Sequence, residues 1–338
     1  MTPDGGEESS GLPRSVPVVT GSDVYNRSVP VGLVLAIGIV AISSAGILVR
    51  LLPGVPALAI AAWRLIISAA ITVPVAAYRG DLRMPADKDA WRSAAAGAFL
   101  TLHFALWITS LKLTTVASSV VLGTTTPLWV SIVSHLFLQE RNTAREWLGV
   151  AFGILGGVLI GLGDSRMAGS KVAVASGSAL LGDALALASA FAISGYFILG
   201  RSVRQRLRLL TYTAYVYIVA AVLLTATAGA FRAPLFGYTG RDYALLVCFA
   251  VFPQLVGHNS LNWALARLKA SVVTLSVLGE AVLSSAAAAV LFHEIPPPLA
   301  LAGYAFILMG IALASRGYPR GSGTGSDPGS DPVPDPLN

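Results

Sequence analysis

The sequence from Pro253 to Glu294 reads PQLVGHNSLNWALARLKASVVTLSVLGEAVLSSAAAAVLFHE, two apolar runs with polar side chains in their interiors. In the first run, Gln254, His258 and Asn262 are four residues apart, so an α-helix places them on one face. The second run carries Glu280 near its centre. An ionisable side chain there is costly in hydrocarbon unless it faces water or a partner. The stretch therefore predicts two membrane helices that face an interior cavity.

The composition of the whole chain agrees with this interpretation. Of its 338 residues, 55% are hydrophobic and only 12% are charged, and the mean hydropathy is +0.72. Such a chain has too little charge to cover a soluble globule. The net charge of +6 does not indicate nucleic-acid binding, because the basic residues lie in short breaks between apolar runs. We therefore expect an all-α integral membrane protein whose surroundings are the lipid bilayer.

Ten apolar runs have the length of about 20 residues that a helix needs to cross the hydrocarbon core. They cover 31–49, 56–78, 93–111, 116–138, 144–163, 178–200, 211–230, 243–264, 270–292 and 299–315. The terminal segments 1–28 and 317–338 are rich in Gly, Pro, Ser and Asp, which predicts disordered cytoplasmic tails.

The basic residues predict the orientation of these ten helices. Sixteen Lys and Arg residues fall in segments on the same side as the N-terminus, six fall on the opposite side, and Arg64 lies within a span. Loops rich in Lys and Arg stay in the cytoplasm. We therefore expect both termini to be cytoplasmic, in a multi-pass protein of the plasma membrane or the bacterial inner membrane.

The two halves of the chain resemble each other weakly. At an offset of 154 residues, Glu140 aligns with Glu294 and Gly156 with Gly310. This predicts a first repeat at 29–165 and a second at 176–316, each with five helices. Because five is odd, the second repeat enters the membrane from the opposite side. Inverted-topology repeats of this kind are typical of secondary transporters with a substrate site near the midplane.

Four stretches carry a resemblance to a known family. They are TPLWVSIVSHLFLQER (126–141), WLGVAFGILGGVLIG (147–161), LGEAVLSSAAAAVLFHE (278–294) and LAGYAFILMGIALASR (301–316). Together they resemble the paired EamA domains of the drug/metabolite transporter superfamily. The resemblance implies a transporter of small metabolites and gives export as its direction. The family often has Glu-Pro where this chain has Glu280 and Ala281, so a helix break in the ninth span stays open.

Eight polar or aromatic residues within the spans are candidate substrate-binding residues. They are Arg64, His103, Trp107, Gln254, His258, Asn262, Trp263 and Glu280. Imidazole, indole and amide groups suit a zwitterionic or amphipathic solute, although they could also serve only as hydrogen bonds between helices. Three roles for the two charges stay open: an Arg64–Glu280 ion pair, contacts to a carboxylate and an amine of one solute, or proton coupling through Glu280.

Other residues have simpler interpretations. Tyr212, Tyr215, Tyr217 and Tyr243 are close to span ends and are assigned to the interfacial aromatic belt. The glycines of 149–161 and 303–310 predict close helix packing, within one chain or in a homodimer. Glu140 lies at a span end, where a structural role is expected.

The sequence has no motif for nucleotide binding, metal binding or nucleophilic catalysis. We therefore expect no cofactor, no metal and no enzymatic activity. The hypothesis that follows is a secondary active exporter of small organic metabolites such as amino acids, working by alternating access around a mid-membrane cavity. The alternative is a membrane-embedded sensor or enzyme without transport activity.

Overall fold

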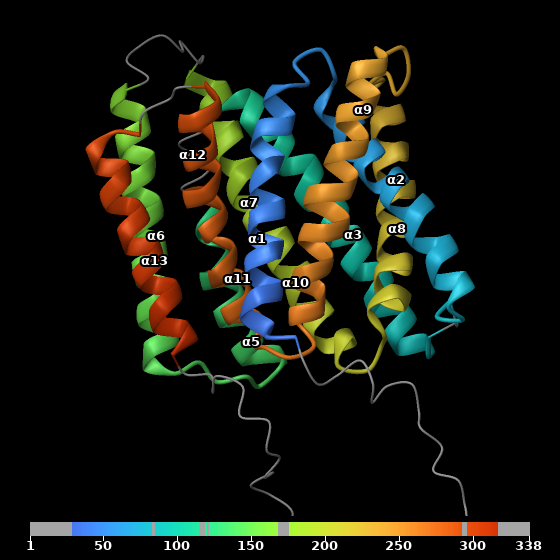
Figure 1. Cartoon of the computed structure of the whole chain (residues 1–338), viewed down its shortest axis with the longest axis horizontal. Coiled ribbons are helices and arrows are strands. Elements are labelled where there is room, and N and C mark those ends of the chain that lie inside the picture. The colour runs from blue at the N-terminus through green and yellow to red at the C-terminus, as the bar shows by residue number, and fades with distance from the viewer. Residues whose placement is uncertain are drawn as a thin grey trace, which may run out of the picture. The chain divides into compact units, whose positions relative to one another are not determined.

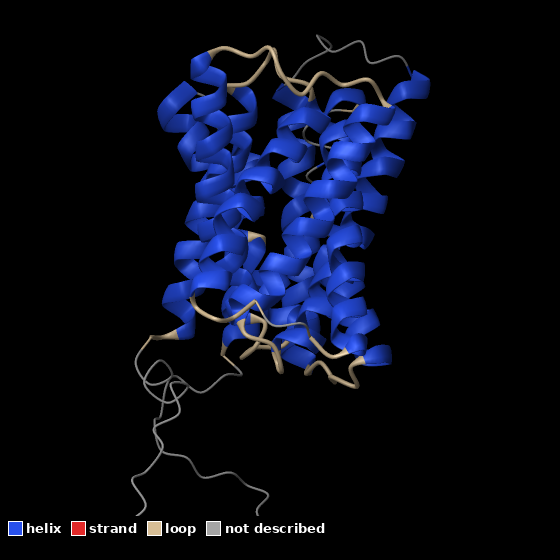
Figure 2. Cartoon of the chain, turned by 90° about the vertical axis from the view of Figure 1, so that its right-hand side faces the viewer, coloured by secondary structure: helices blue, strands red, loops and turns tan. Residues whose placement is uncertain are grey.

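The computed structural model describes residues 29–82, 85–114, 119, 122–167, 176–292 and 296–316. Within these residues every regular element is a helix (Figures 1 and 2). The two segments that the sequence predicts to be disordered, 1–28 and 317–338, lie outside the described residues, as does Glu294.

Nine helical segments of the described chain are long and apolar enough to cross a membrane. The helices are α1 (Val31–Arg50), α2 (Ala57–Tyr78), α3 (Asp87–Leu113), α5 (Thr126–Phe137), α6 (Ala144–Met167), α7 (Ser176–Arg204), α8 (Leu209–Ala230), α9 (Gly240–Phe249), η1 (Ala250–His258), α10 (Asn259–Ala264), α11 (Ala270–Val277), α12 (Gly279–Phe292) and α13 (Pro298–Ser315). Segments α9, η1 and α10 form one span, and α11 with α12 forms another. Of the fourth predicted span, 116–138, the described part contains the shorter apolar helix α5. The all-α membrane fold is confirmed.

The packing of the helices follows the predicted repeat. Helix α6 packs against α13 and α2 against α8, so each of these helices contacts its own counterpart in the other half, and α5 of the fourth span packs against α11 of the ninth. The pair α3 and α7 has its equivalent in the pair η1 and α1. In Figure 1, α1 begins at the lower end of the bundle, whereas its counterpart α7 begins at the upper end. This is the contact pattern of two halves with inverted topology.

Glycines bring α6 and α13 into close contact, and the two helices lie side by side in Figure 1. A Cβ atom added at Gly156 would lie 2.6 Å from the carbonyl oxygen of Gly303, and one added at Gly303 would lie 2.5 Å from the carbonyl oxygen of Gly156. Gly149 and Gly310 approach each other in the same way. The glycine pattern of the sequence therefore serves contact between two helices of the same chain.

The eighth span widens in its middle into the π-helix η1. Pro253 lies inside it, and a proline in a helix interior has no N–H to donate and clashes with the carbonyl group four residues before it. A wider turn, with hydrogen bonds from residue i to residue i+5, relieves that clash. Gln254 and His258 are thus separated by less than one full turn of the helix. The angle between these two side chains around the helix axis therefore differs from that of an ideal α-helix.

The ninth span is broken at Leu278, between α11 and α12. The break occurs without the proline that the family often has there, and it places Glu280 in the first turn of α12. Unpaired N–H groups and the helix dipole favour a carboxylate at this position. In the first half, α5 begins at Thr126, the residue that aligns with Glu280.

Candidate functional site

Arg64 and Gln254 meet in the interior of the bundle, from opposite halves of the chain. Arg64 lies on α2 and is 2% exposed, and its Nε–H donates a hydrogen bond of 2.6 Å to Oε1 of the fully buried Gln254. The Arg64 guanidinium carbon lies 4.3 Å from the ring centroid of Phe104 and 4.9 Å from that of Phe249. Aromatic faces stabilise a desolvated cation. The structure thus joins two of the predicted site residues around a buried positive charge.

The rings of both histidines pack against the ring of Phe104, and the His103 centroid lies 5.1 Å from it. The His258 ring meets the Phe104 ring edge to face, with centroids 5.9 Å apart. His103 stacks on Trp107, with centroids 6.2 Å apart, and its Nδ1 lies 2.9 Å from the hydroxyl oxygen of Ser189 on α7. Both histidines are half-buried. The histidines predicted from the repeat are therefore neighbours in one cluster.

Asn262 joins the same cluster through Tyr196. The Tyr196 hydroxyl donates a 2.8 Å hydrogen bond to Asn262 Oδ1, and the Tyr196 ring lies 6.3 Å from the His258 ring. The Tyr217 hydroxyl likewise donates to Asn259 Oδ1 at 2.6 Å.

The interfacial-belt interpretation is wrong for Tyr212 and Tyr217, because both are fully buried. Their positions near the ends of an apolar run suggested a belt, but packing of α8 against α2 and α3 encloses them. Tyr196, Phe104, Phe249 and Ser189 were not predicted, since no pattern in the sequence separates them from ordinary core residues.

Glu280 lies close enough to Arg64 for the two charges to interact. No ion pair within 4.0 Å joins them, however, and Arg64 is bonded to Gln254 instead. The Glu280 side chain is half-buried. Of the three roles left open by the sequence, a direct ion pair is not present in this structure.

Trp263 contacts a cationic side chain outside this cluster. Its ring lies 3.5 Å from the guanidinium carbon of Arg267, at the end of the eighth span. No described contact joins it to Arg64, His103 or Glu280. Six of the other predicted residues are connected by the contacts above, and Glu280 interacts with them only through the charge of Arg64. A role of any of the eight in substrate binding stays a prediction.

Three side-chain nitrogen atoms of the cluster are buried without a hydrogen-bond partner: Gln254 Nε2, His258 Nδ1 and Asn262 Nδ2. All three belong to the stripe that the sequence predicted. Buried polar groups are nearly always paired with protein or with water. These atoms are therefore available to water or to a bound solute. Among the described residues, no group of three or more His, Cys, Asp or Glu is arranged to hold a metal ion.

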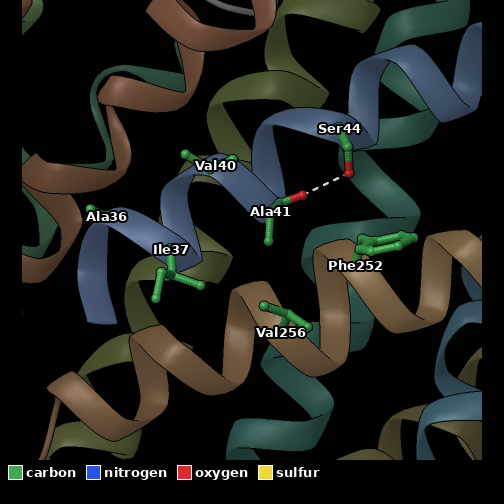
Figure 3. A pocket seen from close by; sticks show the side chains of 7 residues that line it. All are labelled: Ala36, Ile37, Val40, Ala41, Ser44, Phe252 and Val256. Carbon is green, nitrogen blue, oxygen red and sulfur yellow. Dashed lines mark hydrogen bonds between the residues drawn. The ribbon is translucent and has the colours of Figure 1, made fainter. Parts of the chain in front are cut away.

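A separate groove lies between α1 and η1 and has a volume of about 500 Å³ (Figure 3). It is lined by Ala36, Ile37, Val40, Ala41, Ser44, Phe252 and Val256. Ile37, Val40 and Phe252 are about half exposed, and Ser44 donates its hydroxyl hydrogen to Ala41 O at 2.7 Å. An exposed apolar groove of this kind is suited to contact with lipid chains. None of the eight predicted residues lines it.

Comparison with known proteins agrees with the geometry. The model of the EamA-like transporter family matches residues 30–162 and 180–316. A crystal structure described simply as that of a protein shares 20% sequence identity with this chain at a TM-score of 0.70, over 85% of this chain and 97% of the other. At that identity the likeness shows the fold alone. A search of curated proteins finds no match. Two matches that cover both halves of the helical unit establish that the chain belongs to the EamA-like transporter family and is a multi-pass membrane transporter.

Proposed function

We propose that this protein is a secondary active exporter of small organic metabolites such as amino acids. The observation that carries the proposal is the interior cluster of Arg64, Gln254, His258 and Asn262, which has a buried charge and unpartnered polar atoms. A cluster built only for packing would leave those atoms unsatisfied at a cost of about 1–3 kcal/mol each. A solute that enters the cluster would satisfy them.

The backbone around the cluster supports alternating access. The ninth span is discontinuous beside Glu280, and the eighth contains a π-helix beside Gln254. Discontinuous helices near the midplane are typical of transporter substrate sites, and π-turns are frequent at functional sites. The direction of export rests on the family resemblance. The proposed location in the cell membrane with cytoplasmic termini rests on the charge bias of the loops.

Counterflow in proteoliposomes tests the proposal. Vesicles preloaded with unlabelled amino acids and related metabolites should accumulate the matching labelled solute from outside. We expect Glu280→Gln to lower the initial rate about tenfold or more, because it removes the only acidic charge near Arg64 in the described cluster; a tenfold change corresponds to about 1.4 kcal/mol.

The matched control is Asp87→Asn, which removes an exposed carboxylate in the first turn of α3 and should keep the wild-type rate. An unchanged rate in Glu280→Gln would assign Glu280 a structural role. Absence of counterflow for a broad panel, with folded wild-type protein, would favour the sensor or enzyme alternative.

A further inference from the structure

The interior cluster has more hydrogen-bond donors than acceptors. Arg64 Nε–H can only donate, so it fixes the Gln254 amide with Oε1 toward the guanidinium and Nε2 turned away. Asn262 Oδ1 accepts from Tyr196, which leaves the Asn262 Nδ2 group free. Both amides are fully buried, and both nitrogen atoms lack a partner. The Tyr217 hydroxyl lies near both amide groups, but neither nitrogen atom forms a hydrogen bond of normal distance and angle with a described residue. The network therefore holds two amide donors that are open to a stronger acceptor.

Arg64 adds the charge that such an acceptor would need. Its Nε–H is bonded to Gln254, and the four N–H groups on its two Nη atoms have no hydrogen-bond partner among the described residues. The rings of Phe104 and Phe249 lie against the guanidinium, so a ligand approaches it at the N–H edge. That edge matches two oxygen atoms of one planar anionic group.

From this arrangement we propose that the transported solute carries a free carboxylate, bound by the Arg64 guanidinium together with the amide donors of Gln254 and Asn262. This inference rests on the proposed function and names the substrate class of the same site. Glu280 lies within electrostatic reach of Arg64, and in its ionised form it repels a doubly charged anion such as phosphate more strongly than a singly charged carboxylate. The repulsion is smallest for the carboxylate of a zwitterion whose amine is directed toward Glu280.

Binding to purified protein in detergent tests the inference without requiring transport. Four probes share one branched alkyl chain: leucine, leucinamide, 3-methylbutan-1-amine and 4-methylpentanoate. Isothermal titration calorimetry measures their Kd values, and thermal unfolding checks that each protein sample is folded. We expect leucine and 4-methylpentanoate to bind, and the amide and the amine to bind about 10- to 100-fold more weakly, as the loss of charge-assisted hydrogen bonds requires.

Two variants locate the carboxylate. Arg64→Gln should abolish the preference for carboxylates over the amide. Gln254→Glu keeps nearly the same shape and supplies an internal carboxylate to Arg64, so it should stay folded while binding of leucine and 4-methylpentanoate is lost. The second variant keeps the test decisive if Arg64→Gln does not fold.

Three results with folded wild-type protein would overturn the inference. They are equal binding of all four probes, binding of only the amide and the amine, and no binding of either carboxylate. Its failure differs from that of the proposed function. Carboxylate binding without counterflow would reject the exporter and keep the carboxylate site. Counterflow of solutes without a carboxylate would reject the carboxylate site and keep the exporter.

Discussion

An alanine at Gly156 is expected to lower the free energy of unfolding by about 2 kcal/mol or more, in the range of overpacked cores. Its Cβ would lie 2.6 Å from Gly303 O and 3.0 Å from the backbone nitrogen of Ile307. Both are main-chain atoms of α13, so they cannot rotate away as the end of a side chain can. The two helices would have to separate along their contact, which loses dispersion attraction over its whole length.

The matched control is the same substitution at Gly46 in α1. A Cβ there meets no atom within 4 Å, so Gly46→Ala should be neutral or up to about 1 kcal/mol more stable through the higher helix propensity of alanine. Thermal unfolding of both variants in one detergent, followed by tryptophan fluorescence, makes the comparison. Equal unfolding midpoints would show that the contact between α6 and α13 adjusts at no cost.

The glycine contact also shows what could be predicted from the sequence. Small residues at helical spacing in two runs at corresponding places indicated close packing, and Gly156 and Gly303 do meet. The membrane spans could be predicted equally well, because the length of an apolar run and the charge of the residues beside it are local properties of the sequence. The polar stripe of Gln254, His258 and Asn262 was recognisable for the same reason: a polar side chain in a lipid-buried run requires an interior partner.

Features that depend on tertiary packing were harder to predict from the sequence. The break at Leu278 exists without a proline, and the π-helix requires room that only the neighbouring helices define. The sequence left open whether Arg64 pairs with Glu280, since either an acid or an amide could satisfy the guanidinium; in the structure Gln254 does so. The burial of Tyr212 and Tyr217 likewise depends on which helices surround α8.

Two ion pairs connect the halves of the chain at one end of the bundle, and we call them the end clamp. Arg201 Nε lies 2.7 Å from Glu140 Oε1, with each side chain 14% exposed, and Lys269 Nζ lies 3.1 Å from Glu146 Oε2. Arg201 also donates from Nη1 to Leu265 O at 2.8 Å. The clamp thus joins Glu140, in the connection between α5 and α6, to the end of α7, and Glu146, in the first turn of α6, to the connection between α10 and α11.

Alternating access requires the halves to separate at each end in turn, so contacts of this kind oppose opening of their own end. We expect Arg201→Gln to favour the open state there. Charge-assisted hydrogen bonds contribute about 1.5–3 kcal/mol, so the open population should rise about 10- to 100-fold. Hydrogen–deuterium exchange of residues 126–137 and 259–277 should accelerate accordingly, whereas exchange in α9, within the same protein, should stay unchanged.

Arg208→Gln provides the control, since Arg208 forms an ion pair with Asp81 at a similarly short distance of 2.6 Å but is 67% exposed. Solvent screens an exposed pair, which contributes about 0–1 kcal/mol, so this variant should exchange like the wild type. If Arg201→Gln accelerated exchange uniformly through all helices, it would have destabilised the fold and opened no particular end. Acceleration confined to residues 126–137 and 259–277 would identify the structure as a state closed at that end. It would also show that burial of the Glu140–Arg201 pair determines how strongly this end stays closed.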